Sequence, residues 1–289
     1  LSMNPFSSRC CQHNHAQGWP YFTEHLVLAT PDNGVATAIY AACKATVKVG
    51  DGKEITLHEE TNYPFEEGIA FTVSTDEKVA FPFYLRIPSW TQKAEVRVNG
   101  KKVSAAPVAG KYLCINREWA NGDRVELTLP MSLSMRTWQV NKNSVSVDYG
   151  PLTLSLKIAE KYVEKDSRET AIGDSKWQKG ADPQKWPTTE IYPDSPWNYS
   201  LVLDKKEPLK NFKVIRKSWP ADNYPFTVAS VPLEVKAIGR PVPEWKIDET
   251  GLCGVLPEED AVKGDKEEIT LIPMGAARLR ISAFPNTKE

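Results

Sequence analysis

The sequence predicts a mainly β protein made of two antiparallel β-sandwich modules, with a short helical segment in front of them. Short runs rich in β-branched and aromatic residues recur from about residue 33 to the C-terminus. Turn signals such as Asn99-Gly100 divide these runs at intervals of roughly 8–12 residues, which is typical of a sandwich. Only residues 18–29 have the spacing of a helix.

The helical segment is predicted from apolar residues at intervals of three and four: Trp19, Phe22, Leu26 and Ala29. The breaker cluster "TPDNG" follows and is expected to end the helix. An amphipathic helix needs a surface to pack on, and a single helix at the start of a β chain has no evident partner.

The first β module is predicted over residues 33–136. Its strand-like runs are "VATAIYAACKATVKV", "KEITLHEETNYPF", "GIAFTVST", "KVAFPFYLRIPSW", "AEVRVNGKKV", "KYLCINREW" and "DRVELTLPM". The Asn99-Gly100 pair lies between alternating runs, and this is the strongest short-range signal of a hairpin.

The second module is predicted over residues 137–265. It begins with "NSVSVDYGPLTLSLKI", continues through a long polar segment with tryptophans and prolines, and resumes at "YSLVLD", "FKVIRKSW" and "FTVASVPLEVKAIGR". The last strands, residues 268–284, are expected to return to the first module, because sandwiches often take back a terminal strand.

Composition excludes several classes of function. The chain has 289 residues and a formal net charge of −1, so no global field favours nucleic acid or an anionic membrane. No apolar run approaches the roughly 18 residues that a membrane helix requires. The start, "LSMNPFSSRCC", has neither the basic nor the apolar region of a signal peptide and no initiator methionine. We interpret it as an internal start, which leaves the compartment open.

Five cysteines, an odd number at irregular spacing, argue against a disulfide framework. Cys43 and Cys114 lie in strand-like runs and are expected to be buried, inert thiols. Cys253 lies in a loop-like stretch and receives no role.

The adjacent pair Cys10-Cys11 has three interpretations: buried thiols or a vicinal disulfide, a metal site, or a nucleophile. Only the thiolate is a good ligand or nucleophile, and a helix N-terminus or a zinc ion stabilises it. Both cysteines precede the predicted helix. A structural zinc site needs four ligands, which His13 and His15 could complete, although such histidines are more often packing residues.

Two further sets of residues were weighed as candidates for sugar chemistry. "HEETNYPFEEG" contains Glu59, Glu60, Glu66 and Glu67, and paired carboxylates hydrolyse glycosides. Adjacent acids on a strand point to opposite faces, so a solvated rim is the expectation. "HEET" also lacks the second histidine of the zinc motif H-E-x-x-H. Trp177, Trp186 and Trp197 are the better candidates for stacking on sugar rings, with core packing as the alternative.

The chain resembles a known family. The segments that recur in family order are "CC" with Asn14, "NGVATAIYAA", "EETNYPFEEGIAFTV", "FPFYLRIPSW", "VRVNGKKV", "INREWANGDRVELTLPM", "DYGPLTLSLKI", "SPWNYSLVLD" and "ITLIPMGAARLRISAFP". Together, from Cys10 to Pro285, they look like the C-terminal half of the β-L-arabinofuranosidases, glycoside hydrolase family 127 and its uncharacterised relatives.

The resemblance implies an (α/α)6 catalytic barrel followed by β-sandwich modules, with residues 1–32 as the C-terminal end of that barrel. It implies that Cys10 is the nucleophile of a retaining mechanism. Zinc would be bound by Cys11 and Cys10 together with a Glu and a Cys from the missing barrel. His13 and His15 are the candidate substrate-binding residues, and the implied partners are a carbohydrate and the barrel itself.

The chain departs from the family pattern beside the cysteine pair. Gln12 and His13 replace two prolines, and Gln17 stands where an arginine is usual. The departure leaves the sugar open. We therefore expect the C-terminal part of a retaining glycosidase of plant polysaccharides or glycoconjugates, inactive as this chain alone. The alternatives are a carbohydrate-binding or structural β module without catalysis, and a cysteine pair that is only a structural zinc or thiol site.

Overall fold

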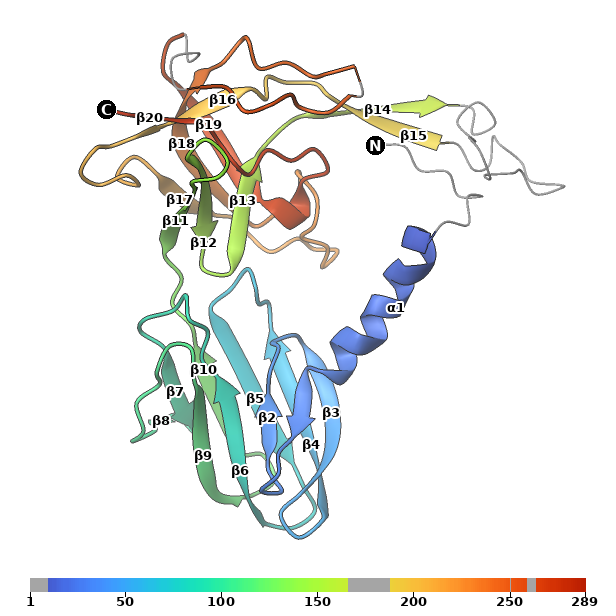
Figure 1. Cartoon of the computed structure of the whole chain (residues 1–289). Helices are drawn as coiled ribbons and strands as arrows, with labels where there is room; N and C mark the ends of the chain where they lie inside the picture. The colour runs from blue at the N-terminus through green and yellow to red at the C-terminus, as the bar shows by residue number, and fades with distance from the viewer. Residues whose placement is uncertain (1–9, 166–187, 250, 259–263) are drawn as a thin grey trace, which may run out of the picture. The chain divides into compact units, whose positions relative to one another are not determined.

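The computed structural model describes residues 10–165, 188–249, 251–258 and 264–289, with side chains from residue 16 onward. The chain divides into two compact units, Cys11–Ser132 and Leu133–Glu289. The described residues are mainly β: one α-helix is followed by strands throughout (Figure 1). The predicted β class is confirmed.

The first unit contains two sheets. The four-stranded sheet has the order β1-β2-β6-β9, with strands β1 (Val27–Ala29), β2 (Val35–Thr37), β6 (Val79–Arg86) and β9 (Tyr112–Trp119). The six-stranded sheet has the order β3-β4-β5-β10-β7-β8, with strands β3 (Cys43–Val49), β4 (Lys53–Thr61), β5 (Gly68–Ser74), β10 (Arg124–Thr128), β7 (Glu95–Val98) and β8 (Lys101–Lys102).

Both sheets of the first unit contribute to one hydrophobic core. Phe71 on β5 packs edge to face against Phe83 on β6, with ring centroids 5.4 Å apart. Trp119 on β9 is fully buried, and its ring nitrogen donates to the carbonyl of Phe81 at 2.9 Å. Buried side chains of β5 alternate with more accessible ones, so this strand also presents a row of side chains on the outer face of its sheet.

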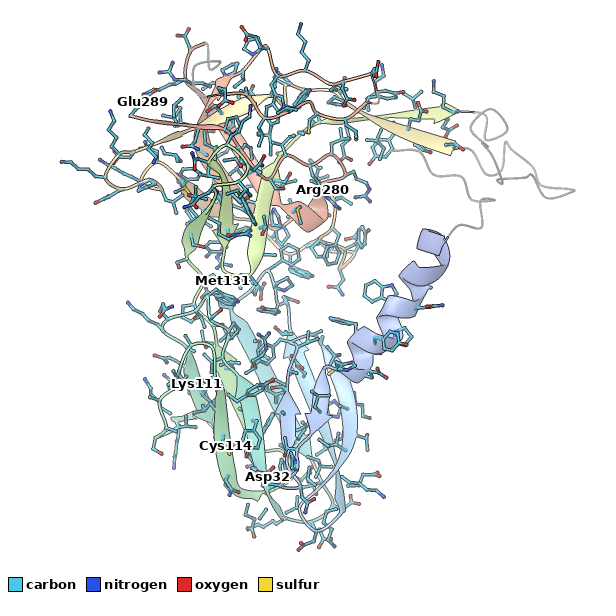
Figure 2. All side chains as sticks on the ribbon, in the orientation of Figure 1. Asp32, Lys111, Cys114, Met131, Arg280 and Glu289 are labelled. Atoms are coloured by element: carbon cyan, nitrogen blue, oxygen red, sulfur yellow. The ribbon has the colours of Figure 1, made fainter. Side chains whose placement is uncertain are left out.

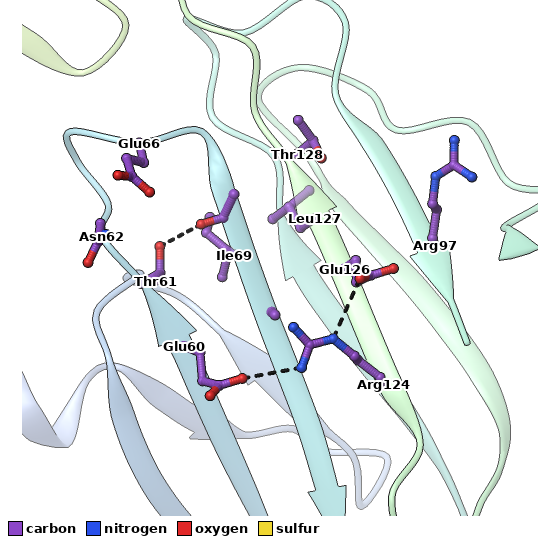
Figure 3. Close-up of a pocket in the computed structure, with 12 residues that line it drawn as sticks. Glu60, Thr61, Asn62, Glu66, Ile69, Arg97, Arg124, Glu126, Leu127 and Thr128 are labelled. Carbon is purple, nitrogen blue, oxygen red and sulfur yellow. Dashed lines mark hydrogen bonds and ion pairs between the residues drawn. The ribbon is translucent and has the colours of Figure 1, made fainter. Parts of the chain in front are cut away.

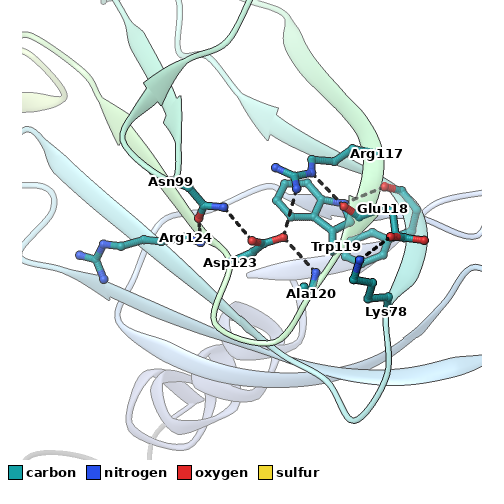
Figure 4. Close-up of polar contacts among 9 residues, drawn as sticks. Lys78, Asn99, Arg117, Glu118, Trp119, Ala120, Asp123 and Arg124 are labelled. Carbon is teal, nitrogen blue, oxygen red and sulfur yellow. Dashed lines mark hydrogen bonds and ion pairs between the residues drawn. The ribbon is translucent and has the colours of Figure 1, made fainter.

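A buried carboxylate ties two turns of this unit together (Figure 4). Asp123 accepts hydrogen bonds from the main-chain N–H of Ala120 at 2.9 Å and from the amide of Asn99 at 2.7 Å, and Arg117 lies 3.4 Å away. Asn99 and Gly100 both have positive φ and connect β7 to β8, so the hairpin predicted from this dipeptide is confirmed. Burial opposes ionisation of Asp123, but the three donors outweigh it and lower its pKa.

The second unit is built around one large sheet with the strand order β11-β12-β13-β19-β18-β16-β20. Strand β17 also pairs with β18. The strands of this sheet are β11 (Leu133–Trp138), β12 (Ser144–Tyr149), β13 (Leu152–Leu156), β16 (Tyr199–Leu203), β17 (Lys213–Arg216), β18 (Leu233–Pro241), β19 (Glu267–Pro273) and β20 (Asn286–Lys288). A short 3-10 helix, Met274–Ala276, follows β19, and β14 (Glu160–Lys165) pairs with β15 (Thr188–Pro193) in a separate ribbon.

This unit has its own core and its own buried ion pairs. Leu154, Leu271 and Phe284 are fully buried in the core. At its edge, Glu234 accepts from Lys157 at 2.7 Å and contacts Lys217 at 2.5 Å. Burial alone would raise the pKa of Glu234, but the two ammonium groups outweigh it and lower that pKa.

The predicted return of residues 268–284 to the first module is wrong. Strand β19 pairs with β13 and β18, all within Leu133–Glu289. The reason is the core of the second unit, where Leu271 and Ile272 of β19 are fully buried. The boundary between the units lies after Ser132, because Leu133–Trp138 pairs with Ser144–Tyr149.

The helix also differs from its prediction. Helix α1 spans Cys10–Glu24, whereas residues 18–29 were expected to be helical. Val27–Ala29 is instead a strand that pairs antiparallel with Val35–Thr37. The breaker cluster after it forms the turn of this hairpin, in which the N–H of Thr30 donates to the carbonyl of Gly34. The apolar spacing used for the prediction therefore covered two elements, the C-terminal part of α1 and strand β1.

Candidate functional site

The predicted site residues lie at the start of helix α1. The main chain of Cys10, Cys11, His13 and His15 is helical, and their side chains lie outside the described part of the structure. Cys10 is the first helical residue, so the cysteines belong to the first turn and do not precede the helix. In a first turn the main-chain N–H groups lack helical partners and the helix dipole is positive, which favours a thiolate.

The rest of α1 is exposed and carries aromatic side chains. Trp19 is 60% exposed and Tyr21 is 66% exposed. Phe22 packs edge to face against Trp19, with ring centroids 6.1 Å apart. Large exposed rings on one short helix are typical of a surface that binds another protein segment.

Three of the four glutamates of "HEETNYPFEEG" are buried or engaged in structural contacts. Strand alternation places Glu59 and Glu60 on opposite faces of β4, as expected. Glu60 is exposed and lies 3.2 Å from Arg124, and Glu67 accepts from the main-chain N–H of Met131 at 3.0 Å. The expectation of a solvated rim is wrong for Glu59, which is only 3% exposed. Its place in the inward row after Ile55 and Leu57 was the signal in the sequence.

Glu59 lies in an apolar environment with few partners. The main-chain N–H of Ala41 donates to its carboxylate, and one of its oxygens lies 3.8 Å from the Cys43 Sγ atom, directly across the strand pair. The other oxygen has no hydrogen-bond partner among the described residues. Burial raises the pKa of Glu59 to about 8, so the group is mostly protonated at neutral pH.

Cys43 is consequently a poor nucleophile. Burial, together with the neighbouring Glu59, raises the pKa of its thiol to about 11. The expected inertness of Cys43 agrees with this pKa, although the side chain is only half-buried. Cys114 differs from its prediction, because it points outward from β9 and is exposed (Figure 2). Cys253 is exposed as well.

Aromatic and cationic groups line the core beside Glu59. The hydroxyl of Tyr40 donates to the carbonyl of Arg86 at 2.5 Å, and the Arg86 guanidinium lies over the Tyr40 ring, 5.9 Å from its centroid. Tyr63 packs edge to face against Tyr40 at 5.9 Å. Burial raises the pKa values of both tyrosines. Both tyrosine hydroxyls are therefore neutral at physiological pH and provide no positive charge for Glu59.

Among the described residues no group of three or more His, Cys, Asp or Glu side chains is placed to hold a metal ion. Within the same residues, no helix has the length and apolar character needed to cross a membrane. Of the tryptophans considered for sugar stacking, Trp177 and Trp186 lie outside the described residues. Trp197 packs edge to face on Trp245, 5.2 Å away, at the core of the second unit, so it serves packing.

Comparisons with known proteins relate both the sequence and the fold to glycosidases. Residues 34–131 match the family model described as β-L-arabinofuranosidase, GH127 middle domain. A search of curated proteins finds no match. Among solved structures, a GH127 β-L-arabinofuranosidase from Geobacillus stearothermophilus T6 is 22% identical with a TM-score of 0.65, covering 99% of this chain and 38% of that one.

Two further solved structures agree with this relationship. A glycoside hydrolase is 22% identical with a TM-score of 0.64, covering 98% of this chain and 40% of that one. A GH127 β-arabinofuranosidase has the same identity and TM-score, covering 99% and 41%. The chain thus spans about two fifths of the length of these structures. The sequence match is thus to the GH127 middle domain over residues 34–131, and the fold of the whole chain is similar to that of these solved structures.

Proposed function

We propose that this chain is the C-terminal part of a retaining glycoside hydrolase of the β-L-arabinofuranosidase type, acting on plant polysaccharide or glycoconjugate sugars. The observation that carries the proposal is the order of its parts: a helix that starts with Cys10-Cys11 runs into a domain that matches the GH127 middle domain. The chain spans only about two fifths of the length of these solved structures, which supports placing the remaining catalytic groups outside these 289 residues. The chain alone is expected to be inactive.

In this proposal Cys10 is the nucleophile. Its thiolate attacks the anomeric carbon as the bond to the glycosidic oxygen breaks, and a general acid from the proposed barrel protonates the leaving alcohol. Water then displaces the thiolate from the thioglycosyl intermediate and releases the sugar. Most retaining glycosidases use a carboxylate in place of the thiolate. Two features of the chain support the role. The first turn of α1 favours the ionised thiol, and two of the glutamates in residues 59–67, Glu60 and Glu67, already contact other groups. His13 and His15 are proposed to contact the substrate.

Cys11 and Cys10 are proposed as zinc ligands. Thiolates suit zinc, and the chain offers two of the four ligands that such a site needs. The Glu and the Cys that would complete it belong to the missing barrel. When bound, zinc would keep both sulfurs ionised at neutral pH.

The architecture supports the proposed context. The two sheets of the first unit share one core, which fits a β-sandwich module, and the second unit is proposed to be another. Residues 1–32 are proposed as the end of the helical barrel. The exposed Trp19 and Phe22, which contact each other on one side of α1, support this, because exposed aromatic rings on a helix favour packing against another element.

The test uses the full-length protein and an aryl β-L-arabinofuranoside. Cys10→Ser should abolish turnover while zinc is retained through the remaining ligands. Cys114→Ser is the matched control, since it removes an exposed thiol from β9 and should leave the rate unchanged. Wild-type activity in Cys10→Ser would show that another group is the nucleophile. Turnover by the 289-residue chain alone would contradict the proposal that the barrel is required.

The second candidate is a β module that binds carbohydrate or serves structure without catalysis. The altered neighbours of the cysteine pair, Gln12 and His13, favour it. Full-length protein that binds arabinosides but hydrolyses none of them would support this candidate over the first.

A further inference from the structure

A polar groove crosses the outer face of the six-stranded sheet in the first unit (Figure 3). We call it the β5 groove; its volume is about 620 Å³. Its lining comes from β4, β5, β10, β7 and the loop after β4, and consists of Glu60, Thr61, Asn62, Glu66, Gly68, Ile69, Ala70, Arg97, Arg124, Glu126, Leu127 and Thr128. None of these residues is aromatic.

The groove follows from side-chain size across the strand register. Ala70 of β5 lies opposite Glu60 of β4 on one side and Glu126 of β10 on the other. Gly68 is the next outward residue of β5, so the floor is formed by the two smallest side chains. Strands lie roughly 4.8 Å apart, which places the main chains of Glu60 and Glu126 about 10 Å from each other. The floor is therefore walled by long polar side chains.

Most of the charged side chains of the walls are paired, and Glu66 is the lining carboxylate without an ion pair among the described residues. Figure 3 shows Arg124 between Glu60, at 3.2 Å, and Glu126, at 3.5 Å. Arg97 lies at the far side and pairs with Glu95 at 3.6 Å. An anionic ligand would compete with two glutamates for Arg124 and would be repelled by the carboxylate of Glu66, so the groove favours a ligand without negative charge.

Other side chains of the groove have donors and acceptors that are not used within the described structure. The side chains of Asn62, Glu66 and Thr128 line the groove and make no hydrogen bond or ion pair with any described residue. An amide, a carboxylate and a hydroxyl together offer both donors and acceptors. The paired carboxylates and the guanidinium keep further lone pairs and N–H groups for a ligand.

We infer that the β5 groove binds an uncharged oligosaccharide through hydrogen bonds to its hydroxyl groups. Each sugar hydroxyl both donates and accepts, which matches a mixed wall of amide, carboxylate, guanidinium and hydroxyl groups. Without an aromatic platform, the groove holds its ligand at the hydroxyl edges and binds weakly. The choice of arabinose rests on the proposed function, whereas the binding of a neutral sugar rests on the groove alone.

Gly68 allows a direct test. A Cβ atom at this position would meet no other atom within 4 Å, and the φ angle of Gly68 is not in the left-handed region. Gly68→Leu should therefore fold and fill the groove. Ala70→Leu obstructs the same floor and is the second variant. Gly275→Leu, at an exposed glycine of the second unit with equally open space, is the matched control.

The 289-residue chain and its variants are titrated with neutral arabino-oligosaccharides by calorimetry, and thermal unfolding verifies folding. Wild type and Gly275→Leu should bind alike, and Gly68→Leu and Ala70→Leu should bind at least tenfold more weakly. Undiminished binding in both groove variants, or no binding by wild type, would overturn the inference. Tighter binding of acidic oligogalacturonides than of neutral sugars would also overturn it.

The outcome is separable from the proposed function, because binding needs no turnover. If the full-length enzyme hydrolyses arabinofuranosides through Cys10 while the groove variants bind as wild type does, the groove inference fails alone. If the groove variants lose binding while Cys10→Ser keeps full activity, the proposed mechanism fails alone.

Discussion

Replacing Glu59 by glutamine should remove a pH-dependent loss of stability from the unit Cys11–Ser132. The pKa of Glu59 is about 8 in the folded chain, against an ordinary value of 4.5. The folded state therefore keeps a proton that the unfolded chain releases. The contribution of this proton to stability is complete below about pH 4.5 and is lost as the pH rises towards 8.

The magnitude follows from the size of the shift. pH 7 lies about 2.5 units above the ordinary pKa of the carboxyl group. Each unit lowers the unfolding free energy by about 1.36 kcal/mol, so the loss at pH 7 is about 3 kcal/mol. At pH 5 the loss is only about 1 kcal/mol. Glutamine has nearly the shape of the protonated acid and can still accept from the N–H of Ala41, so Glu59→Gln should avoid the loss without creating a cavity.

The assay is urea unfolding at pH values from 5 to 8, with hydrogen exchange over residues 53–74 to assign the change to the first unit. The unfolding free energy of Glu59→Gln should exceed that of wild type by an amount that grows with pH up to about 8. Glu60→Gln is the matched control: its carboxylate is exposed and paired with Arg124, so the variant should change stability by less than about 1 kcal/mol. A wild-type-to-variant difference that is constant with pH would refute the reasoning, because Glu59 would then be ionised inside the fold.

Three further predictions concern other charged groups and the cysteine pair. Asp123→Ala removes the acceptor for two hydrogen bonds and should lower the unfolding free energy of the first unit by about 2 kcal/mol, measured by urea unfolding; no change would contradict its bridging role. The lowered pKa of Glu234 contributes stability above its ordinary value of 4.5 that is lost as the pH falls through the folded value. In acid titrations, Glu234→Gln should therefore lose less stability than wild type, and an equal loss would argue against its pairing with Lys157. Cys10 and Cys11 offer two of four zinc ligands, so metal analysis of the 289-residue chain should find far less than one zinc per chain; one tightly held zinc would show a complete local site.

Patterns that span a few residues predicted their structures correctly. Strand alternation placed Glu59 and Glu60 on opposite faces, and Asn99-Gly100 formed the expected hairpin. The β class followed from runs and turns of the same local kind, and the order of segments from Cys10 to Pro285 indicated a resemblance that the match of residues 34–131 supports. Local signals suffice here because side-chain alternation and turn geometry are properties of the nearby chain.

Partners from distant parts of the chain decided the rest. Strand β19 joined β13 and β18 because their inward side chains share one core, and no local pattern encodes that choice. The burial of Glu59 depends on residues from other elements that pack around it. The position at which α1 ends depends on the pairing of the following strand with Val35–Thr37. The β5 groove likewise exists only because register brings two small side chains of β5 between long ones of β4 and β10. Burial, pairing and concavity are properties of surfaces that meet in space, so only the tertiary structure determined them.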